Sequence, residues 1–122
     1  MTDQEAFTTV ARHLLTQKER AIKSNPNNHL VPMCAYRGED GKKCAVGCLI
    51  PDELYLKEME DWPVRGLVIN FPSIASLFKD VDVSLLKKLQ FLHDDPIETP
   101  YWAIQLRHFA KEFNLKWELE SE

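Results

Sequence analysis

The chain opens with a pattern of apolar and polar residues that is typical of an amphipathic helix. Thr2 and Glu5 have the spacing of a capping box, in which each side chain accepts a hydrogen bond from the backbone amide of the other. The apolar positions that follow are Phe7, Val10, Ala11, Leu14, Ala21 and Ile22. Because this spacing places the side chains on one face, the pattern predicts a helix that continues to the Asn-Pro-Asn-Asn stretch at 25–28, where a turn is favoured.

Helical spacing returns in the second half of the chain. The predicted segments are 51–55, 64–70, 74–78, a longer helix that follows a cap at Asp82 or Ser84 and stops at 94–96, and a last helix that starts at 99–100. The longer helix has an apolar stripe formed by Leu85, Leu86, Leu89, Leu92 and His93. The inward positions of the last helix are Trp102, Leu106, Phe109, Ala110 and Phe113.

The segment from Cys34 to Cys48 breaks the helical pattern, and it holds three of the four glycines and all three cysteines. It predicts a two-stranded hairpin with either a two-residue turn at 40–41 or a three-residue loop at 39–41 in which Gly41 is left-handed. The second register is favoured because it separates apolar from charged side chains. It places Cys34, Tyr36, Cys44 and Val46 on one face and Ala35, Arg37, Lys43 and Ala45 on the other.

These patterns together predict an α+β fold that is mainly helical, with about five helices packed around one two-stranded antiparallel hairpin. The chain has 122 residues, of which 44% are hydrophobic and 28% charged, so we expect a single globular domain at 1–117 and an acidic tail at 118–122. No apolar run approaches the roughly 20 residues that cross a bilayer, and the polar, acidic first residues are unlike a signal peptide. An odd number of cysteines is typical of a reducing compartment, so a cytoplasmic protein is expected.

The net charge of −4 bears on the class of partner. Nucleic acid is disfavoured as a partner because the chain lacks the basic excess that supplies most nucleic-acid affinity. The acidic residues also do not form the long rows expected of a DNA mimic. Neither a nucleic acid nor a membrane is therefore predicted as a partner.

The cysteines could carry metal or nucleophilic chemistry. Cys34, Cys44, Cys48 and His93 would complete a Cys3His zinc set, but only Cys44 and Cys48 have the local spacing that zinc usually uses. Thiols that pack as small buried hydrophobic groups explain the same residues, so no metal or other cofactor is predicted. A nucleophile at Cys44 or Cys48 would need a histidine base, and no known catalytic signature surrounds either thiol.

The hairpin also offers a candidate site for an anion. Arg37 and Lys43 share its predicted outward face, and Tyr36, Gly38 and Asp40 lie beside them. Paired cations on adjacent strands repel each other mildly, which an anionic ligand would relieve. Glu39 and Asp40, or carboxylates elsewhere in the chain, could neutralise them instead. The glycine spacing matches neither a dinucleotide fingerprint nor a P-loop.

Two further residues are candidates for binding. His93 comes near the end of a predicted helix, where it either takes part in a site or simply interacts with the helix dipole and packs against the hairpin. Trp117 comes after the last predicted helix and could anchor a partner, because interface hot spots favour tryptophan. It could equally fold back onto the helix.

The stretch at 36–55 resembles a family signature. It reads Tyr-Arg-Gly-Glu-Asp-Gly-Lys-Lys-Cys-Ala-Val-Gly-Cys-Leu-Ile-Pro-Asp-Glu-Leu-Tyr and is similar to a motif of small uncharacterised proteins from bacteriophages and bacterial genomes. Residues 85–94 are similar to a second block of those proteins. The resemblance implies no activity, but it does imply a gene carried by a phage or another mobile element.

The preferred function is therefore that of a phage- or mobile-element-encoded accessory protein that binds a host macromolecule, most simply a host protein, in the bacterial cytoplasm. The candidate binding residues are Tyr36, Arg37, Gly38, Asp40, Lys43, His93 and Trp117. A protein that binds or sequesters a phosphorylated or nucleotide ligand is the first alternative. A small cysteine-dependent enzyme is the second.

Overall fold

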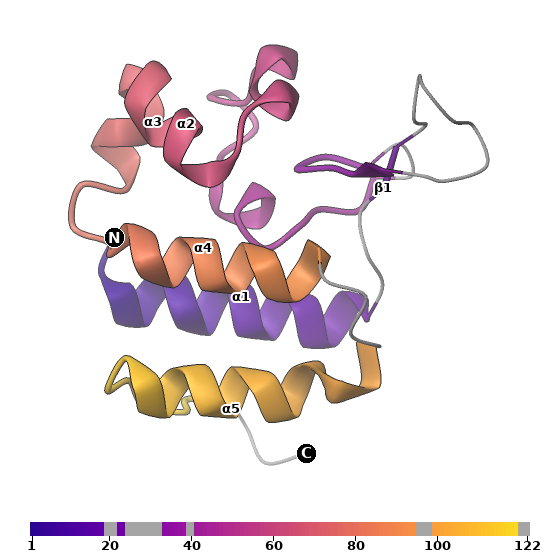
Figure 1. The fold of residues 1–122 in the computed structure, drawn as a ribbon, viewed down its shortest axis with the longest axis vertical. Coiled ribbons are helices and arrows are strands. Elements are labelled where there is room, and N and C mark those ends of the chain that lie inside the picture. The colour runs from indigo at the N-terminus through magenta and orange to yellow at the C-terminus, as the bar shows by residue number, and fades with distance from the viewer. Residues whose placement is uncertain (19–21, 24–32, 39–40, 95–98, 120–122) are drawn as a thin grey trace.

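The computed structural model describes residues 1–18, 22–23, 33–38, 41–94 and 99–119, and helices dominate them (Figure 1). The α-helices are α1 (Asp3–Gln17), α2 (Val64–Asn70), α3 (Pro72–Leu77), α4 (Val83–Asp94) and α5 (Trp102–Glu112). The 3-10 helices are η1 (Gly47–Leu49), η2 (Lys57–Asp61) and η3 (Thr99–Tyr101). Two short strands, β1 (Ile22–Lys23) and β2 (Met33–Cys34), pair antiparallel. None of the described helices combines the length and hydrophobicity needed to span a membrane.

Three helices form the frame of the molecule. Helix α1 packs against both α4 and α5, and α4 also contacts α5. Helix α5 runs antiparallel to α1 and α4 (Figure 1). Helices α2 and α3 pack on each other, and α2 covers the side of α4 that lies away from α5. The largest side chains that this arrangement buries completely include Phe7, Leu14, Leu85, Leu86, Leu89, Trp102 and Leu106. The apolar stripes predicted for these three helices therefore meet in one core.

Helix α1 begins as predicted and ends earlier than predicted. Thr2 Oγ1 accepts from the Glu5 amide at 3.1 Å, and Glu5 Oε1 accepts from the Thr2 amide at 2.9 Å, which completes the capping box. The helix ends at Gln17, because Lys18 takes the left-handed conformation and its amide bonds to the Leu14 carbonyl. Ile22 belongs to β1 rather than to the helix, while Ala21 and the predicted stop at 25–28 lie outside the described residues.

The predicted hairpin, and with it the α+β assignment, is wrong. Cys34 pairs with Ile22 in the β1–β2 ladder, not with the segment that carries Cys44. Between residues 36 and 44 the described residues contain a single antiparallel bridge, between Arg37 and Lys43. Val46 has helical backbone angles, and η1 starts at the next residue. The described chain is thus mainly helical, and it has no hairpin at its centre.

Side chains of distant helices bond to the backbone on both sides of this bridge. The Lys43 amide donates to Gln17 Oε1 at 3.0 Å, and the Lys43 carbonyl accepts from Gln17 Nε2 and His13 Nε2, both at 2.9 Å. The Val46 amide donates to Gln90 Oε1 of α4 at 3.1 Å. In the expected hairpin the Val46 amide would have bonded to the opposite strand, and α4 satisfies it instead. The Lys43 amide and carbonyl face away from the Arg37–Lys43 bridge, and α1 satisfies them.

Two glycines shape this segment. Gly41 has a φ of +84°, the left-handed conformation that the three-residue loop requires. At Gly47 the constraint is space, because a Cβ would lie 2.1 Å from the Tyr36 carbonyl oxygen. Gly47 therefore lets the chain after the bridge close directly against the chain before it.

The later helices follow the predictions closely. Helix α2 has the predicted bounds, and α3 starts two residues earlier than predicted, with Pro72 in its first turn. Asp82 precedes α4 and accepts from the Ser84 amide at 2.8 Å. Residues 51–55 form a hydrogen-bonded turn, while η2 is an element that the sequence pattern does not predict.

Candidate functional site

At the predicted anion site, polar side chains of the chain interact with one another. We call this group the arginine cluster and define it as Arg37, Lys43, Asp52, Tyr55 and Glu60. Arg37 Nη1 donates to Asp52 Oδ1, Arg37 Nη2 donates to the Ile50 carbonyl at 2.6 Å, and the guanidinium lies 4.9 Å from the centre of the Tyr55 ring. The Arg37 side chain is only 18% exposed, so it does not point outward as predicted.

Asp52 lies where an anionic ligand would have to bind. Its carboxylate contacts Arg37 and lies 3.7 Å from Lys43 Nζ, although its side chain is 79% exposed. The hydrogen bond from Arg37 and the charge of Lys43 lower the pKa of Asp52 below its ordinary value. The carboxylate is therefore ionised at neutral pH and neutralises both cations from within the chain.

Glu60 ties the cluster to the backbone. Its two carboxylate oxygens accept from the Tyr36 and Arg37 amides at 2.9 and 3.0 Å, and Oε2 also accepts from the Tyr55 hydroxyl at 2.6 Å. Burial and then the Glu60 carboxylate raise the pKa of Tyr55, which leaves that hydroxyl protonated as a donor. These bonds hold the segment at 36–37 against η2.

The other predicted residues of this segment are structural or lie outside the description. Tyr36 is buried, and its hydroxyl donates to the Trp62 carbonyl at 2.6 Å. The Gly38 amide donates to the Lys42 carbonyl at 2.7 Å. Asp40 lies outside the described residues.

The cysteine residues do not show the environment of a nucleophile. Cys44 is fully buried, and its sulfur accepts from the Gly47 amide at 3.1 Å. Cys48 Sγ donates to the Ala45 carbonyl at 3.0 Å, and burial raises its pKa to about 12, so that it stays a thiol at neutral pH. The side chain of Cys34 lies outside the description. Within the described part of the chain, no three His, Cys, Asp or Glu side chains are grouped as a metal site would require.

His93 and Trp117 both lie away from the arginine cluster. His93 is fully buried, and its ring centre lies 6.1 Å from that of Trp102. The Trp117 ring packs edge-on against Phe7 at 6.2 Å, and the Arg107 guanidinium lies 4.3 Å from its centre. Gln4 also exchanges two hydrogen bonds with the Lys116 backbone, so this segment folds back onto α1 rather than projecting outward.

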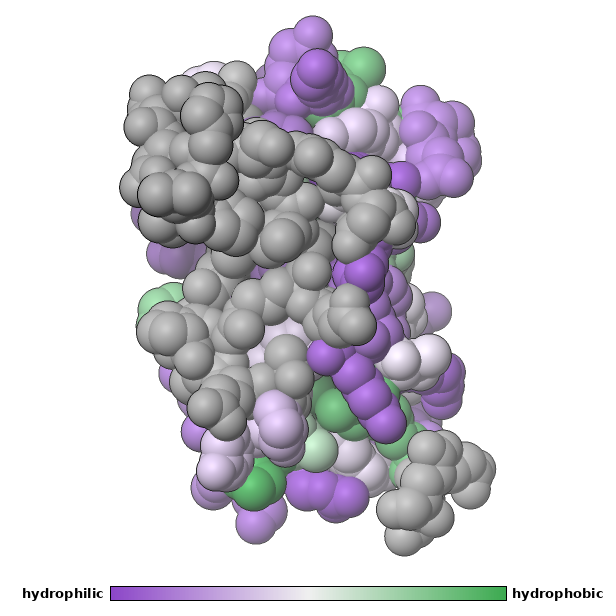
Figure 2. Space-filling model, turned by 90° about the vertical axis from the view of Figure 1, so that its right-hand side faces the viewer, coloured by the Kyte–Doolittle hydropathy of each residue, from purple (hydrophilic) through white to green (hydrophobic). Residues whose placement is uncertain are grey.

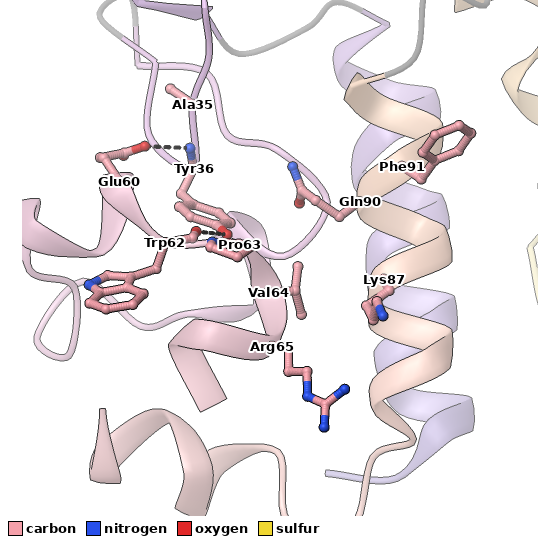
Figure 3. A pocket seen from close by; sticks show the side chains of 10 residues that line it. All are labelled: Ala35, Tyr36, Glu60, Trp62, Pro63, Val64, Arg65, Lys87, Gln90 and Phe91. Atoms are coloured by element: carbon pink, nitrogen blue, oxygen red, sulfur yellow. Dashed lines mark hydrogen bonds between the residues drawn. The ribbon is translucent and has the colours of Figure 1, made fainter. Parts of the chain in front are cut away.

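The structure instead shows two hollows on either side of α4, neither of which the sequence interpretation identified. The first groove has a volume of about 550 Å³ and lies between α4 and the chain at 35–36 and 60–65 (Figure 3). Its lining residues are Ala35, Tyr36, Glu60, Trp62, Pro63, Val64, Arg65, Lys87, Gln90 and Phe91. Figure 3 shows Tyr36 and Glu60 on one wall and the α4 side chains on the other, with Arg65 at the lower end of the groove, beyond Val64.

The second groove lies between α4 and α5 and has a volume of about 450 Å³. Its lining residues are Lys87, Lys88, Phe91, Leu92, Gln105 and Phe109. Because Lys87 and Phe91 line both grooves, the two hollows adjoin across α4. We call this surface, comprising both grooves and the ridge between them, the α4 face.

Phe91 stands on the ridge with 63% of its surface exposed. A phenylalanine on the polar side of a helix was visible in the sequence, since Lys87, Lys88 and Phe91 share one face at helical spacing. That signal identifies an exposed aromatic residue, but the grooves on both sides of it depend on α2 and α5. In Figure 2 the hydrophobic areas that are visible among the described residues lie next to hydrophilic ones.

The comparisons with known proteins leave the family open. No family model matches the sequence, and no solved structure matches it. A stretch of 67 residues is 30% identical to Beta-hexosaminidase 1 from Coccidioides posadasii. That stretch covers 52% of this chain, and the chain spans only 11% of the length of the hexosaminidase. The likeness is a local one.

Proposed function

We propose that this chain is a binding protein that engages another protein through the α4 face. In line with the resemblance of the 36–55 stretch, its role is that of a phage- or mobile-element-encoded accessory protein that binds and modulates a host protein. The observation that carries the proposal is Phe91, a large aromatic side chain that is mostly exposed between two grooves. Aromatic residues of this kind, flanked by pockets, supply much of the energy of protein interfaces.

The arginine cluster supports this choice over a phosphorylated ligand. Asp52 contacts Arg37 and lies near Lys43, so an incoming phosphate would have to displace a carboxylate that is already in place. The raised pKa of Cys48 likewise argues against a thiolate nucleophile at that position. On the α4 face Lys88 is paired with Glu112, but no carboxylate of a described residue lies within ion-pairing distance of Arg65 or Lys87.

The test is photo-crosslinking from one position. A photoreactive phenylalanine analogue replaces Phe91, and in a control protein it replaces Tyr101, another exposed aromatic residue that lines neither groove. We expect position 91 to trap one bacterial protein that position 101 does not trap. The trapped protein is then purified, and its affinity is measured by calorimetry.

The expected result is that Phe91→Ala weakens binding of the purified partner by about tenfold or more, whereas Tyr101→Ala leaves it unchanged. Both variants should keep the helical circular dichroism of the parent protein. The proposal fails if position 91 traps no specific protein, or if Phe91→Ala binds the trapped protein as tightly as the parent does.

A further inference from the structure

We infer that the partner segment is acidic and that it places an apolar side chain on each side of Phe91. This inference rests on the proposed function and adds the chemistry of the partner. On the α4 face, the two adjoining grooves share two lining residues, Lys87 and Phe91. An occupant that covers Phe91 must extend into at least one groove, and one that covers the whole ridge reaches both.

The floors of the grooves are suited to apolar side chains. Trp62, Pro63 and Val64 are among the residues that line the first groove, and Trp62 is 41% exposed overall. In the second groove Leu92, Phe109 and Phe91 line the hollow together with lysine side chains, whose methylene stems add apolar surface. Both volumes lie within the range of about 300 to 1,000 Å³ that is usual for pockets that hold organic groups.

The rim of the α4 face is basic. Arg65, Lys87 and Lys88 line the grooves, and Glu60 is the only carboxylate among the described residues that line them. Glu60 is turned inward, because both of its oxygens already accept bonds from the arginine cluster and the backbone. The local charge is thus opposite to the net charge of −4 of the whole chain.

Two of these cations have no partner within the described chain. Lys88 Nζ lies 2.7 Å from Glu112 Oε2, but no carboxylate of a described residue lies within ion-pairing distance of Arg65 or Lys87. Both are therefore available to carboxylates that come from outside. Charge complementarity of this kind increases the rate of association and excludes partners of the wrong sign.

The experiment uses two synthetic peptides as probes. They have the same length and the same apolar residues, but one carries glutamate at every remaining position and the other carries lysine. Binding to the full chain is followed by fluorescence anisotropy of a dye on the peptide. We expect the glutamate peptide to bind about tenfold or more tightly than the lysine peptide, with the preference falling as salt rises from about 0.01 M to about 1 M.

Charge reversal gives the matched control. The double variant Arg65→Glu with Lys87→Glu should prefer the lysine peptide, whereas Lys79→Glu, at an exposed position that lines neither groove, should keep the preference of the parent. Phe91→Ala should weaken both peptides, because it removes the apolar ridge and not the charge.

Three outcomes would overturn the inference. The peptides could bind equally well, the double variant could keep the preference of the parent, or neither peptide could bind. A fourth outcome is self-association in sedimentation experiments that Phe91→Ala abolishes, which would assign the α4 face to a second copy of the chain. If position 91 still traps a specific protein in any of the first three cases, the acidic partner is wrong while the binding function stands.

Discussion

The arginine cluster and the α4 face both contain cations, but those of the cluster are neutralised by carboxylates of the chain, whereas two of those on the α4 face are not neutralised by any described residue. In the cluster, Arg37 contacts Asp52 and a backbone carbonyl, and Lys43 lies near the same carboxylate. On the α4 face, no carboxylate of a described residue pairs with Arg65 or Lys87. The comparison shows that a cation already paired within the chain holds the fold together, whereas an unpaired cation beside exposed apolar surface is available for a partner.

The largest effect on stability among variants near the arginine cluster is expected from Gly47→Ala, which displaces the backbone at Tyr36, next to Arg37. The new Cβ would lie 2.1 Å from the Tyr36 carbonyl oxygen, so the chain before the bridge has to move. We expect the free energy of unfolding to fall by about 3 kcal/mol, measured by urea denaturation. Gly41→Ala is the control: it has open space but a positive φ, and should lose about 1 to 2 kcal/mol. Equal losses would contradict the role given to Gly47.

Glu60→Gln should have the next largest effect. The amide keeps one acceptor oxygen but turns an NH2 group toward donors that Glu60 now accepts from. We expect a loss of about 2 kcal/mol in the free energy of unfolding, since hydrogen bonds to a charged group are lost. Glu58→Gln, at an exposed position on the same short helix, should change it little. A loss of the same size at both positions would mean that charge on η2, and not these bonds, matters.

Asp52→Asn should make stability less dependent on pH. Because pairing with Arg37 and Lys43 lowers the folded pKa of Asp52, its contribution is present above the unfolded pKa and disappears as pH falls through the folded pKa. The denaturation midpoints of the parent and of Asp52→Asn should therefore differ at neutral pH and converge in acid. Asp80→Asn is the control, since Asp80 is exposed and forms no ion pair with described residues. A difference that persists in acid would show that the Asp52 charge is not its source.

The smallest effect on folding is expected from Phe91→Ala. The side chain is mostly exposed, so its removal should change the free energy of unfolding by less than about 0.5 kcal/mol, measured by the same denaturation. Phe7→Ala, in the fully buried core, should lose about 3 to 5 kcal/mol. A large loss at Phe91 would mean that the α4 face stabilises the fold, and the comparison between the two regions would fail.

Much of the helical framework could be predicted from the sequence. The capping box at Thr2, the bounds of α2 and the stripe of α4 all follow from contacts between residues a few positions apart. The prediction fails where long-range contacts compete. Helix α1 stops at Gln17, and the Gln17 side chain then bonds to Lys43, which no helical period could indicate.

The surroundings of the candidate site residues depend on the same kind of long-range contact. Arg37 and Lys43 were correctly grouped, because the single bridge places them opposite each other. The sequence allows several carboxylates to neutralise these two cations. Asp52 does so because the turn at 51–55 lies against Arg37 and Lys43. For Trp117 the sequence allows both an anchor for a partner and a residue that folds back, and in the structure its ring packs against Phe7 and Arg107.

The sequence by itself determined the apolar stripes of α1, α4 and α5 and the left-handed turn at Gly41, since these depend on local periodicity and on backbone geometry. Only the tertiary structure decided that Gln17 bonds to the Lys43 backbone, that Gln90 takes the Val46 amide of the expected hairpin, and that Phe91 stands between two grooves. The physical reason is that hydrogen-bond partners and exposed surface depend on contacts between segments that are far apart in the sequence. The periodicity of residues within one segment does not indicate which other segments it will contact.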